Sequence, residues 1–121
     1  MYSSKFTTQA LEDLKDLPKN VRNSLKREFT RKIHLRPIEC SEALSAPLEK
    51  FRSFHYRDYR VVYQVLEDLK IVAVVGIGRK DRHHHGEMYK RLEDLARSGK
   101  LAAAILDTYR SISATGESPD E

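Results

Sequence analysis

The chain has 121 residues, which is enough for one domain with a single modest core and too few for a second domain. Hydrophobic residues make up 40% and charged residues 33% of the chain, with only 5 Gly and 4 Pro, a composition that excludes disordered and fibrous proteins. Lys and Arg total 22 against 18 Asp and Glu, which gives a net charge of +4. This charge could attract phosphates, but many small basic proteins that bind no nucleic acid have a similar charge.

The cysteine content and the apolar runs bear on the location of the protein. The single cysteine, Cys40, cannot form an internal disulfide, which indicates a reducing compartment, and a lone cysteine is more often an apolar filler than a nucleophile. No apolar run approaches the roughly 20 residues that would span a bilayer, and the N-terminal residues lack the apolar centre of a signal peptide. We therefore expect a cytoplasmic protein that does not associate with membranes.

The N-terminal third predicts one strand and two helices. Residues 2–7 suit a short strand. A capping threonine and apolar residues at helical spacing then predict a helix that stops at Pro18. Pro18 can also open a second helix, in which apolar residues recur every three to four positions as far as Ile33. We expect these two helices to form a hairpin, with the basic face of the second helix in solvent.

Three strands are expected in the middle of the chain. Pro37 and Pro47 bracket a stretch without a sustained period, which predicts a loop with one helical turn at most. Extended segments follow at residues 49–57, 59–66 and 70–78, and the short breaks between them suit tight antiparallel turns. The third segment is apolar on both faces, as in the buried centre of a sheet.

The C-terminal part predicts one or two helices, with Gly99 as a break, followed by a polar and disordered end. We divide the chain into a domain over residues 1–97 and an extension over residues 98–121 that is helical to about residue 112. The expected fold class is α+β, with the N-terminal helical hairpin packed on one face of a curved, mainly antiparallel four-stranded sheet, and one or two C-terminal helices.

Strand periodicity separates aromatic residues from cations in residues 51–65, because alternate side chains of a strand face opposite sides. The apolar side of the second extended segment is formed by Tyr59, Val61, Tyr63 and Val65. That side should pack beneath the helical hairpin, which leaves Arg60 on the open face. If Phe54 and Tyr56 join the core, His55 shares the open face with Arg60.

Further cations follow the apolar strand. Arg79, Lys80 and Arg82 come directly at or after its end. A single arginine on an open sheet face is more often solvated or paired across strands. Cations that converge from two neighbouring segments instead form a suitable cradle for a phosphodiester backbone.

Three consecutive histidines occupy positions 83–85. Adjacent side chains diverge on a helix or a strand, and no cysteine or HxxxH spacing is nearby, so we predict no metal site. Two interpretations of the histidines remain. One histidine transfers protons near the cations, or the three form a solvated turn. The sequence GIG at residues 76–78 does not match a glycine-rich phosphate loop.

Three motifs stand out in this chain: DYRVVYQV, an apolar strand that ends in GxGRK, and the later EMYKR. With these motifs the chain resembles the RelE branch of the RelE/ParE toxin superfamily, and the similarity spans roughly residues 2–92. The resemblance implies the toxin of a type II toxin–antitoxin pair, with residues 1–97 as a RelE-like toxin domain and a cognate antitoxin protein as its partner.

The resemblance also implies an activity. A RelE-like toxin enters the ribosomal A site and cleaves mRNA there without a metal or a small-molecule cofactor. The ribose 2′-hydroxyl attacks the adjacent phosphate and gives a 2′,3′-cyclic phosphate and a free 5′-hydroxyl. This chemistry needs a base, cations that offset the charge on the phosphate, and an acid for the leaving oxygen.

The functional positions of the family can be matched to this chain. Arg60 matches the strand arginine, and Lys80 or the adjacent Arg79 matches the cation after the last strand; both would stabilise the transition state. Tyr89 matches the helix tyrosine that stacks on or orients the nucleotide at the cut. Relatives often carry lysines at two positions that are Phe51 and Ser53 here.

Histidines can supply the proton transfer that the missing lysines would otherwise perform. The candidate catalytic residues are therefore His55, Arg60, Lys80, His83, His85 and Tyr89. The candidate RNA-binding residues are Arg52, Arg57, Arg79 and Arg82.

Two alternative functions stay open. One is a ParE-like inhibitor of DNA gyrase, which shares the fold and binds a protein target instead of cutting RNA. The other is a catalytically inactive RelE-like binding protein, an alternative favoured by the absence of both strand lysines.

Overall fold

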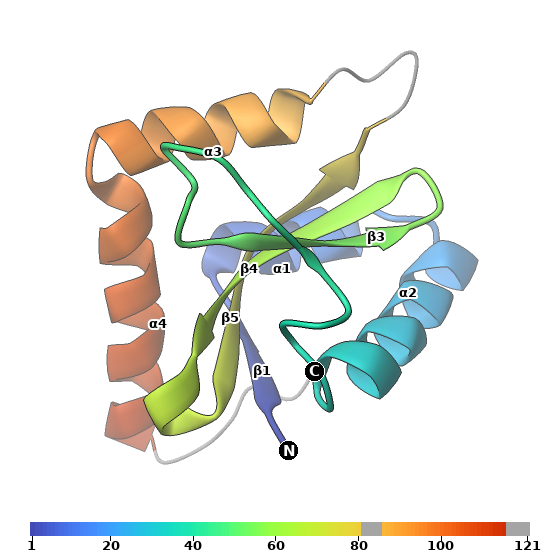
Figure 1. Cartoon of the computed structure of the whole chain (residues 1–121), viewed down its shortest axis with the longest axis horizontal. Helices are drawn as coiled ribbons and strands as arrows, with labels where there is room; N and C mark the ends of the chain where they lie inside the picture. Colours follow the sequence, from blue (N-terminus) through green and yellow to red (C-terminus); the bar gives the residue numbers. More distant parts are fainter. Residues whose placement is uncertain (81–85, 116–121) are drawn as a thin grey trace.

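The computed structural model describes residues 1–80 and 86–115 (Figure 1). In chain order the elements are β1 (Ser3–Phe6), α1 (Thr8–Lys15), α2 (Lys19–Ile33), β2 (Glu42–Ala43), β3 (Arg52–Tyr56), β4 (Tyr59–Leu66), a 3-10 turn (Glu67–Leu69), β5 (Ile71–Arg79), α3 (Glu87–Arg97) and α4 (Lys100–Thr115). The strands form one sheet in the order β1-β5-β4-β3-β2. The pair β1–β5 is parallel and the other three pairs are antiparallel.

The expected α+β fold is confirmed, and one detail of it is wrong: the sheet has five strands instead of four. The additional strand is β2, which pairs with β3 through Glu42–Ser53 and Ala43–Arg52. It lies in the segment between Pro37 and Pro47 that we predicted to be a loop. A two-residue strand is too short to show the alternation by which longer strands are recognised.

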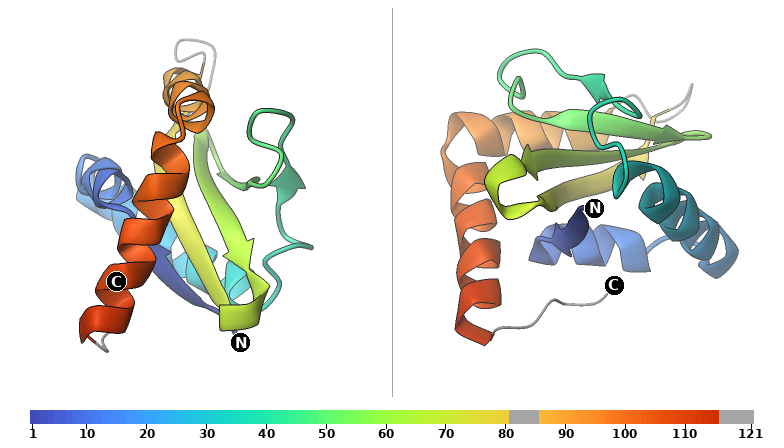
Figure 2. Two further views of the ribbon diagram at one scale, coloured as in Figure 1. Left: turned by 90° about the vertical axis from the view of Figure 1, so that its left-hand side faces the viewer. Right: turned by 60° about the horizontal axis from the view of Figure 1, so that its bottom comes forward.

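The helical hairpin packs on one face of the sheet, as the sequence predicts (Figure 2). The side chain of Thr7 caps α1 by accepting a hydrogen bond from the backbone N–H of Ala10 at 3.2 Å, and α2 begins directly after Pro18. The buried residues of this layer are Ala10, Leu14, Leu25, Phe29, Ile33, Phe54, Val61, Tyr63, Val72, Val74 and Ile77. The predicted apolar side of β4 thus lies beneath the hairpin.

The opposite face of the sheet, which we expected to be open around Arg60, is covered. Helices α3 and α4 cover it in a second core formed by Leu48, Phe51, Val62, Val75, Met88, Leu92 and Leu101. Val62 and Val75 supply apolar surface on this side of the sheet, and burying it against α3 is favourable. Figure 2 shows α4 turning away from α3 and running along the side of the sheet.

Two glycines of β5 set the distance between α3 and the sheet. A Cβ atom at Gly78 would lie 2.8 Å from Cβ of Met88, and one at Gly76 would lie 3.1 Å from Sδ of the same methionine. The GIG sequence therefore serves close helix packing. Gly99, with φ of 81°, separates α3 from α4, which confirms the predicted break.

An ion pair ties α3 to α1 around the edge of the sheet. Strand β1 ends opposite Val74, so it offers no partner to the N–H of Ile77. The carboxylate of Asp13 accepts a hydrogen bond from that N–H at 3.0 Å and from the guanidinium of Arg91 at 2.9 Å. Asp13 therefore provides the hydrogen-bond partner that Ile77 of β5 lacks, and it fixes the position of α3 along this strand.

Helix α4 continues as far as Thr115, the last described residue. The division into a domain over residues 1–97 and an extension stays a prediction. Among the described helices, none is long and apolar enough to cross a membrane.

We predict that Gly78→Ala destabilises the protein more than Gly76→Ala. The new methyl group at position 78 meets the Cβ of Met88, which moves only with the helix, whereas position 76 meets the flexible ends of side chains. The expected loss for Gly78→Ala is about 1–3 kcal/mol in the free energy of unfolding, measured by guanidinium denaturation. Equal losses for the two variants would contradict this account of the packing.

Candidate functional site

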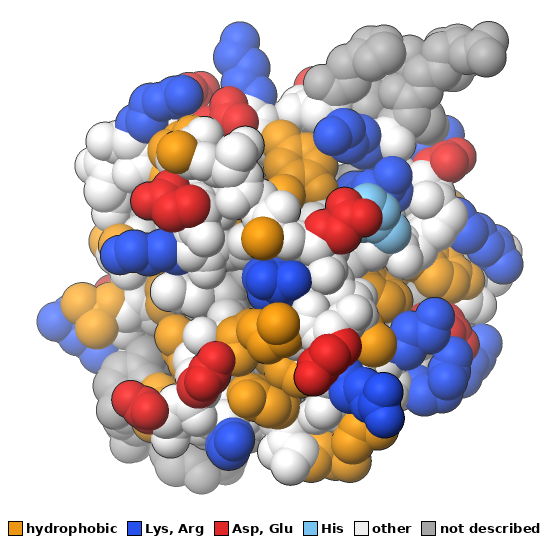
Figure 3. All heavy atoms as spheres, viewed as in Figure 1, with side chains coloured by type: hydrophobic (Ala, Val, Ile, Leu, Met, Phe, Trp, Pro, Cys, Tyr) orange, Lys and Arg blue, Asp and Glu red, His pale blue; other side chains and the backbone are white. Residues whose placement is uncertain are grey.

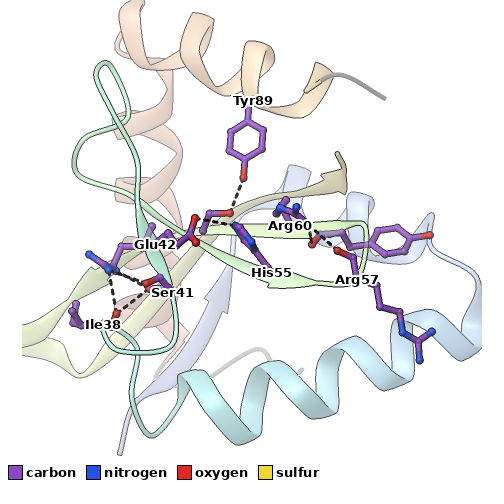
Figure 4. Close-up of polar contacts among 10 residues, drawn as sticks. Ile38, Ser41, Glu42, His55, Arg57, Arg60 and Tyr89 are labelled. Atoms are coloured by element: carbon purple, nitrogen blue, oxygen red, sulfur yellow. Dashed lines mark hydrogen bonds and ion pairs between the residues drawn. The ribbon is translucent and has the colours of Figure 1, made fainter. Parts of the chain in front are cut away.

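Four candidate catalytic side chains lie where the β3–β4 hairpin passes the start of α3, and Figure 4 shows three of them, His55, Arg60 and Tyr89. His55 and Arg60 are directly opposite each other on β3 and β4. The N–H of Lys80 donates to the carbonyl of Asp58 at 2.7 Å, which holds the end of β5 against the hairpin turn. The ammonium of Lys80 lies 5.0 Å from the ring centroid of Tyr89. A histidine, two cations and a tyrosine thus come from four different segments.

The guanidinium of Arg60 is oriented by its own hairpin. Its Nη1 donates to the carbonyl of Arg57 at 2.9 Å and to that of Tyr59 at 3.0 Å (Figure 4). Arg60 is half-buried. These two hydrogen bonds hold the guanidinium in one orientation. Because both acceptors are neutral carbonyl oxygens, the positive charge of Arg60 is not paired by these two bonds.

The hydroxyl of Tyr89 is anchored to β3. It shares a hydrogen bond of 2.6 Å with Oγ of Ser53, a side chain that is 1% exposed. Burial raises the pKa of Tyr89, against opposing effects of Ser53 and Arg60, so the phenol is protonated at neutral pH. The ring therefore stands over β3 in a fixed orientation and faces Lys80.

His55 is the titratable group of this site. Desolvation by burial is the largest cause that lowers its pKa, and the charges of Arg60 and Lys80 lower it further, while Glu42 raises it. The imidazole is therefore neutral at pH 7 and able to accept a proton. Its Nε2 lies 3.5 Å from Oε1 of Glu42 on β2.

The arrangement can stabilise negative charge and exchange a proton at the same place. In Figure 3, Lys and Arg side chains gather on the right-hand part of the molecule, where Figure 1 shows the β3–β4 hairpin and α2. Within residues 1–80 and 86–115, no group of three or more His, Cys, Asp or Glu side chains is arranged to hold a metal ion.

Among the described candidate RNA-binding arginines, Arg52 makes contacts within the loop before β3. The guanidinium of Arg52 braces the preceding loop, with Nε donating to Oγ of Ser41 at 2.6 Å and Nη2 donating to the carbonyls of Ile38 and Ser41 at 3.1 Å each (Figure 4). These bonds occupy much of its donor capacity, so the described contacts of Arg52 are those of a structural residue.

Arg57 and Arg79 stack on tyrosines of the hairpin layer. The guanidinium carbon of Arg57 lies 5.1 Å from the ring centroid of Tyr56, and that of Arg79 lies 6.0 Å from the ring centroid of Tyr59. Both rings pack against the core beneath α1 and α2. Lys80, not Arg79, is therefore the cation beside Tyr89.

The remaining site predictions fall outside the described residues. They concern Arg82, His83 and His85.

The sequence did not reveal two contacts of the candidate catalytic residues: that of Glu42 with His55 and that of Ser53 with Tyr89. Ser53 was noted only as a position without a lysine, and its contact with Tyr89 joins residues 36 positions apart. Glu42 lies in the segment whose short strand carries no periodic signal.

The family comparison identifies one match that covers most of the chain. A model described as the ParE toxin of the type II toxin–antitoxin system parDE matches residues 5–84. The matched region begins within β1 and contains β2 to β5, and thus His55, Arg60 and Lys80, and it ends before Tyr89.

Similar proteins of known structure or function are RelE toxins. The mRNA interferase toxin RelE of Escherichia coli strain K12 is 27% identical over 92 residues, which cover 75% of this chain and 97% of RelE. The crystal structure of the isolated E. coli RelE toxin has a TM-score of 0.58 at 27% identity, covering 76% of this chain and 95% of that one. A chain of the intact E. coli RelBE toxin–antitoxin complex has a TM-score of 0.56 at 27% identity, covering 68% and 100%, respectively. The chain therefore has the RelE fold.

We predict that Ser53→Ala destabilises the protein by about 1–2 kcal/mol, because it leaves the partly buried hydroxyl of Tyr89 without its partner. The double variant Ser53→Ala/Tyr89→Phe removes both hydroxyls and should recover part of this loss. Denaturant unfolding of the wild type, both single variants and the double variant measures the coupling. Strictly additive effects would show that the two hydroxyls do not interact.

Proposed function

The chain belongs to the family of ParE toxins of type II toxin–antitoxin systems, and on that premise we propose that it is an mRNA interferase, an endoribonuclease that cleaves mRNA. The observation that carries the proposal is the convergence of His55, Arg60, Lys80 and Tyr89 at one end of the sheet. The similarity to the mRNA interferase RelE supports the same activity.

His55 and the two cations would divide the first half of the reaction between them. Neutral His55 takes the proton of the ribose 2′-hydroxyl, and the 2′-oxygen forms a bond to the adjacent phosphorus. Arg60 and Lys80 offset the negative charge that builds up on the non-bridging phosphate oxygens. Charge stabilisation of this kind is commonly the largest contribution to such a rate.

The second half of the reaction breaks the bond from phosphorus to the 5′-oxygen. The products are a 2′,3′-cyclic phosphate and a 5′-hydroxyl, and the 5′-oxygen takes up one proton as it leaves. We assign this proton to His83 or His85, and the orientation of the nucleotide to Tyr89. The fixed ring of Tyr89 supports this role, because a stacking partner held in place reduces the entropy lost when substrate binds.

We propose that the substrate is presented in the ribosomal A site. The side chain of His55 is 41% exposed, and Lys80 is exposed too, so the site is a surface feature. An exposed site can bind an RNA that another assembly already holds in an extended conformation. On this proposal the protein acts in the cytoplasm, together with translating ribosomes.

We also propose that a cognate antitoxin protein silences the toxin. A solved complex of the similar RelE chain with its antitoxin supports this partner. The exposed basic residues of α2 suit an acidic, amphipathic segment. We also propose that the candidate RNA-binding residues bind the phosphate backbone of the mRNA; they are Arg52, Arg57, Arg79 and Arg82.

One observation favours a second function, inhibition of DNA gyrase. The matching family model is described as ParE. A gyrase inhibitor would need neither a neutral histidine nor the adjoining cations. It would stop growth while leaving mRNA intact, so the same experiment separates the two functions.

We predict that inducing the protein in cells produces new mRNA 5′ ends within codons of a translated reporter. Arg60→Ala should lower this cleavage by about 10²-fold or more, because it removes a cation that contacts the transition state. Blocking translation of the reporter should also remove the cuts.

The matched control is Arg110→Ala, which removes an exposed arginine of α4 and should cleave like the wild type. Circular dichroism should show that both variants are folded. Growth arrest with intact mRNA would favour gyrase as the target, and no arrest at all would favour an inactive binding protein.

A further inference from the structure

We infer that Glu42 is a positioning residue for His55, so that the base of the proposed ribonuclease is a glutamate–histidine pair. The inference rests on the proposed function and deepens it. It is carried by the geometry of strand β2 and of the loop that leads into it.

Strand β2 places the carboxylate of Glu42 beside the imidazole. Glu42 pairs with Ser53, which is two residues before His55 on β3, so Glu42 and His55 are diagonal neighbours on the sheet. Their side chains approach to 3.5 Å between Oε1 and Nε2 (Figure 4). Diagonal neighbours in antiparallel strands are within reach of long side chains.

Hydrogen bonds to the residues just before Glu42 hold the backbone of β2 in place. Three hydrogen bonds from Arg52 hold Ser41 and Ile38. The fully buried Tyr63 donates from its hydroxyl to the carbonyl of Pro37 at 2.5 Å. An exposed carboxylate on a free loop would sample many positions, whereas here its backbone is fixed to β3 and to the core.

The charges that face His55 from the described elements act in opposite directions. Arg60 on β4 and Lys80 after β5 disfavour the imidazolium, as does burial, and Tyr89 on α3 is a neutral phenol. Among these described groups, Glu42 is the one that favours the imidazolium. It therefore limits the fall in the pKa of His55 and keeps it closer to neutrality.

A carboxylate at Nε2 has two consequences for proton transfer. It favours the tautomer with hydrogen on Nε2, which leaves the lone pair of Nδ1 to accept the proton of the 2′-hydroxyl. It also stabilises the imidazolium that forms when this proton arrives. Glu42 itself touches neither the phosphate nor the attacking oxygen in this arrangement.

The first test is an NMR titration of the His55 imidazole in the wild type, Glu42→Gln and Glu39→Gln, with the signal assigned by His55→Gln. Glu42→Gln should lower the pKa of His55 by a few tenths of a unit, the range expected for an exposed ion pair. Glu39→Gln removes an exposed carboxylate of the same loop and should leave it unchanged. An unchanged pKa in Glu42→Gln would overturn the inference, and so would an equal fall in Glu39→Gln.

The second test measures mRNA cleavage against pH in a translation extract. In Glu42→Gln the acid limb of the profile should move to lower pH by the same amount as the pKa, kcat should fall several-fold, and KM should not change. A fall in KM with unchanged kcat would mean that Glu42 only repels RNA, and it would overturn the inference. If the wild type and Arg60→Ala both fail to cleave, the proposed function fails, whereas the titration still decides whether Glu42 and His55 are coupled.

Discussion

The close approach of α3 to strand β5 is the constraint on which the rest of the structure depends. A Cβ atom at Gly78 would lie 2.8 Å from Cβ of Met88, and one at Gly76 would crowd the flexible ends of Met88, Leu92 and Arg91, so the glycines permit this close distance. The ion pair of Asp13 with Arg91 then fixes the helix along the strand. As a result, Tyr89 reaches Ser53 across the sheet, and the second core closes over what would otherwise be an exposed apolar face.

The candidate site lies where that second core ends and polar groups begin. Burial lowers the pKa of His55, and the charges of the cations Arg60 and Lys80 lower it further. Glu42 works against them from the outermost strand of the sheet. A neutral imidazole and a cationic surface for phosphate thus arise from the same few side chains.

The family contains more than one mode of action on one fold, so the fold alone does not decide the function. The model that matches this chain is described as a ParE toxin, while the curated relative and the crystal structures are of RelE. The proposed nuclease function rests on a proton acceptor, His55, beside the cations Arg60 and Lys80. Helix α4 lies outside the region matched by the family model and contributes Leu101 to the core.

The sequence by itself determined the helical hairpin, four of the five strands (β1, β3, β4 and β5), and the faces of β3 and β4. Helical spacing and two-residue alternation are local signals, and the alternation correctly placed His55 beside Arg60. Only the tertiary structure decided the rest: strand β2, the covered second face, the Ser53–Tyr89 contact, and Lys80 as the cation at the site. These features join residues far apart in the chain, or, for β2, occupy too few residues to leave a periodic signal.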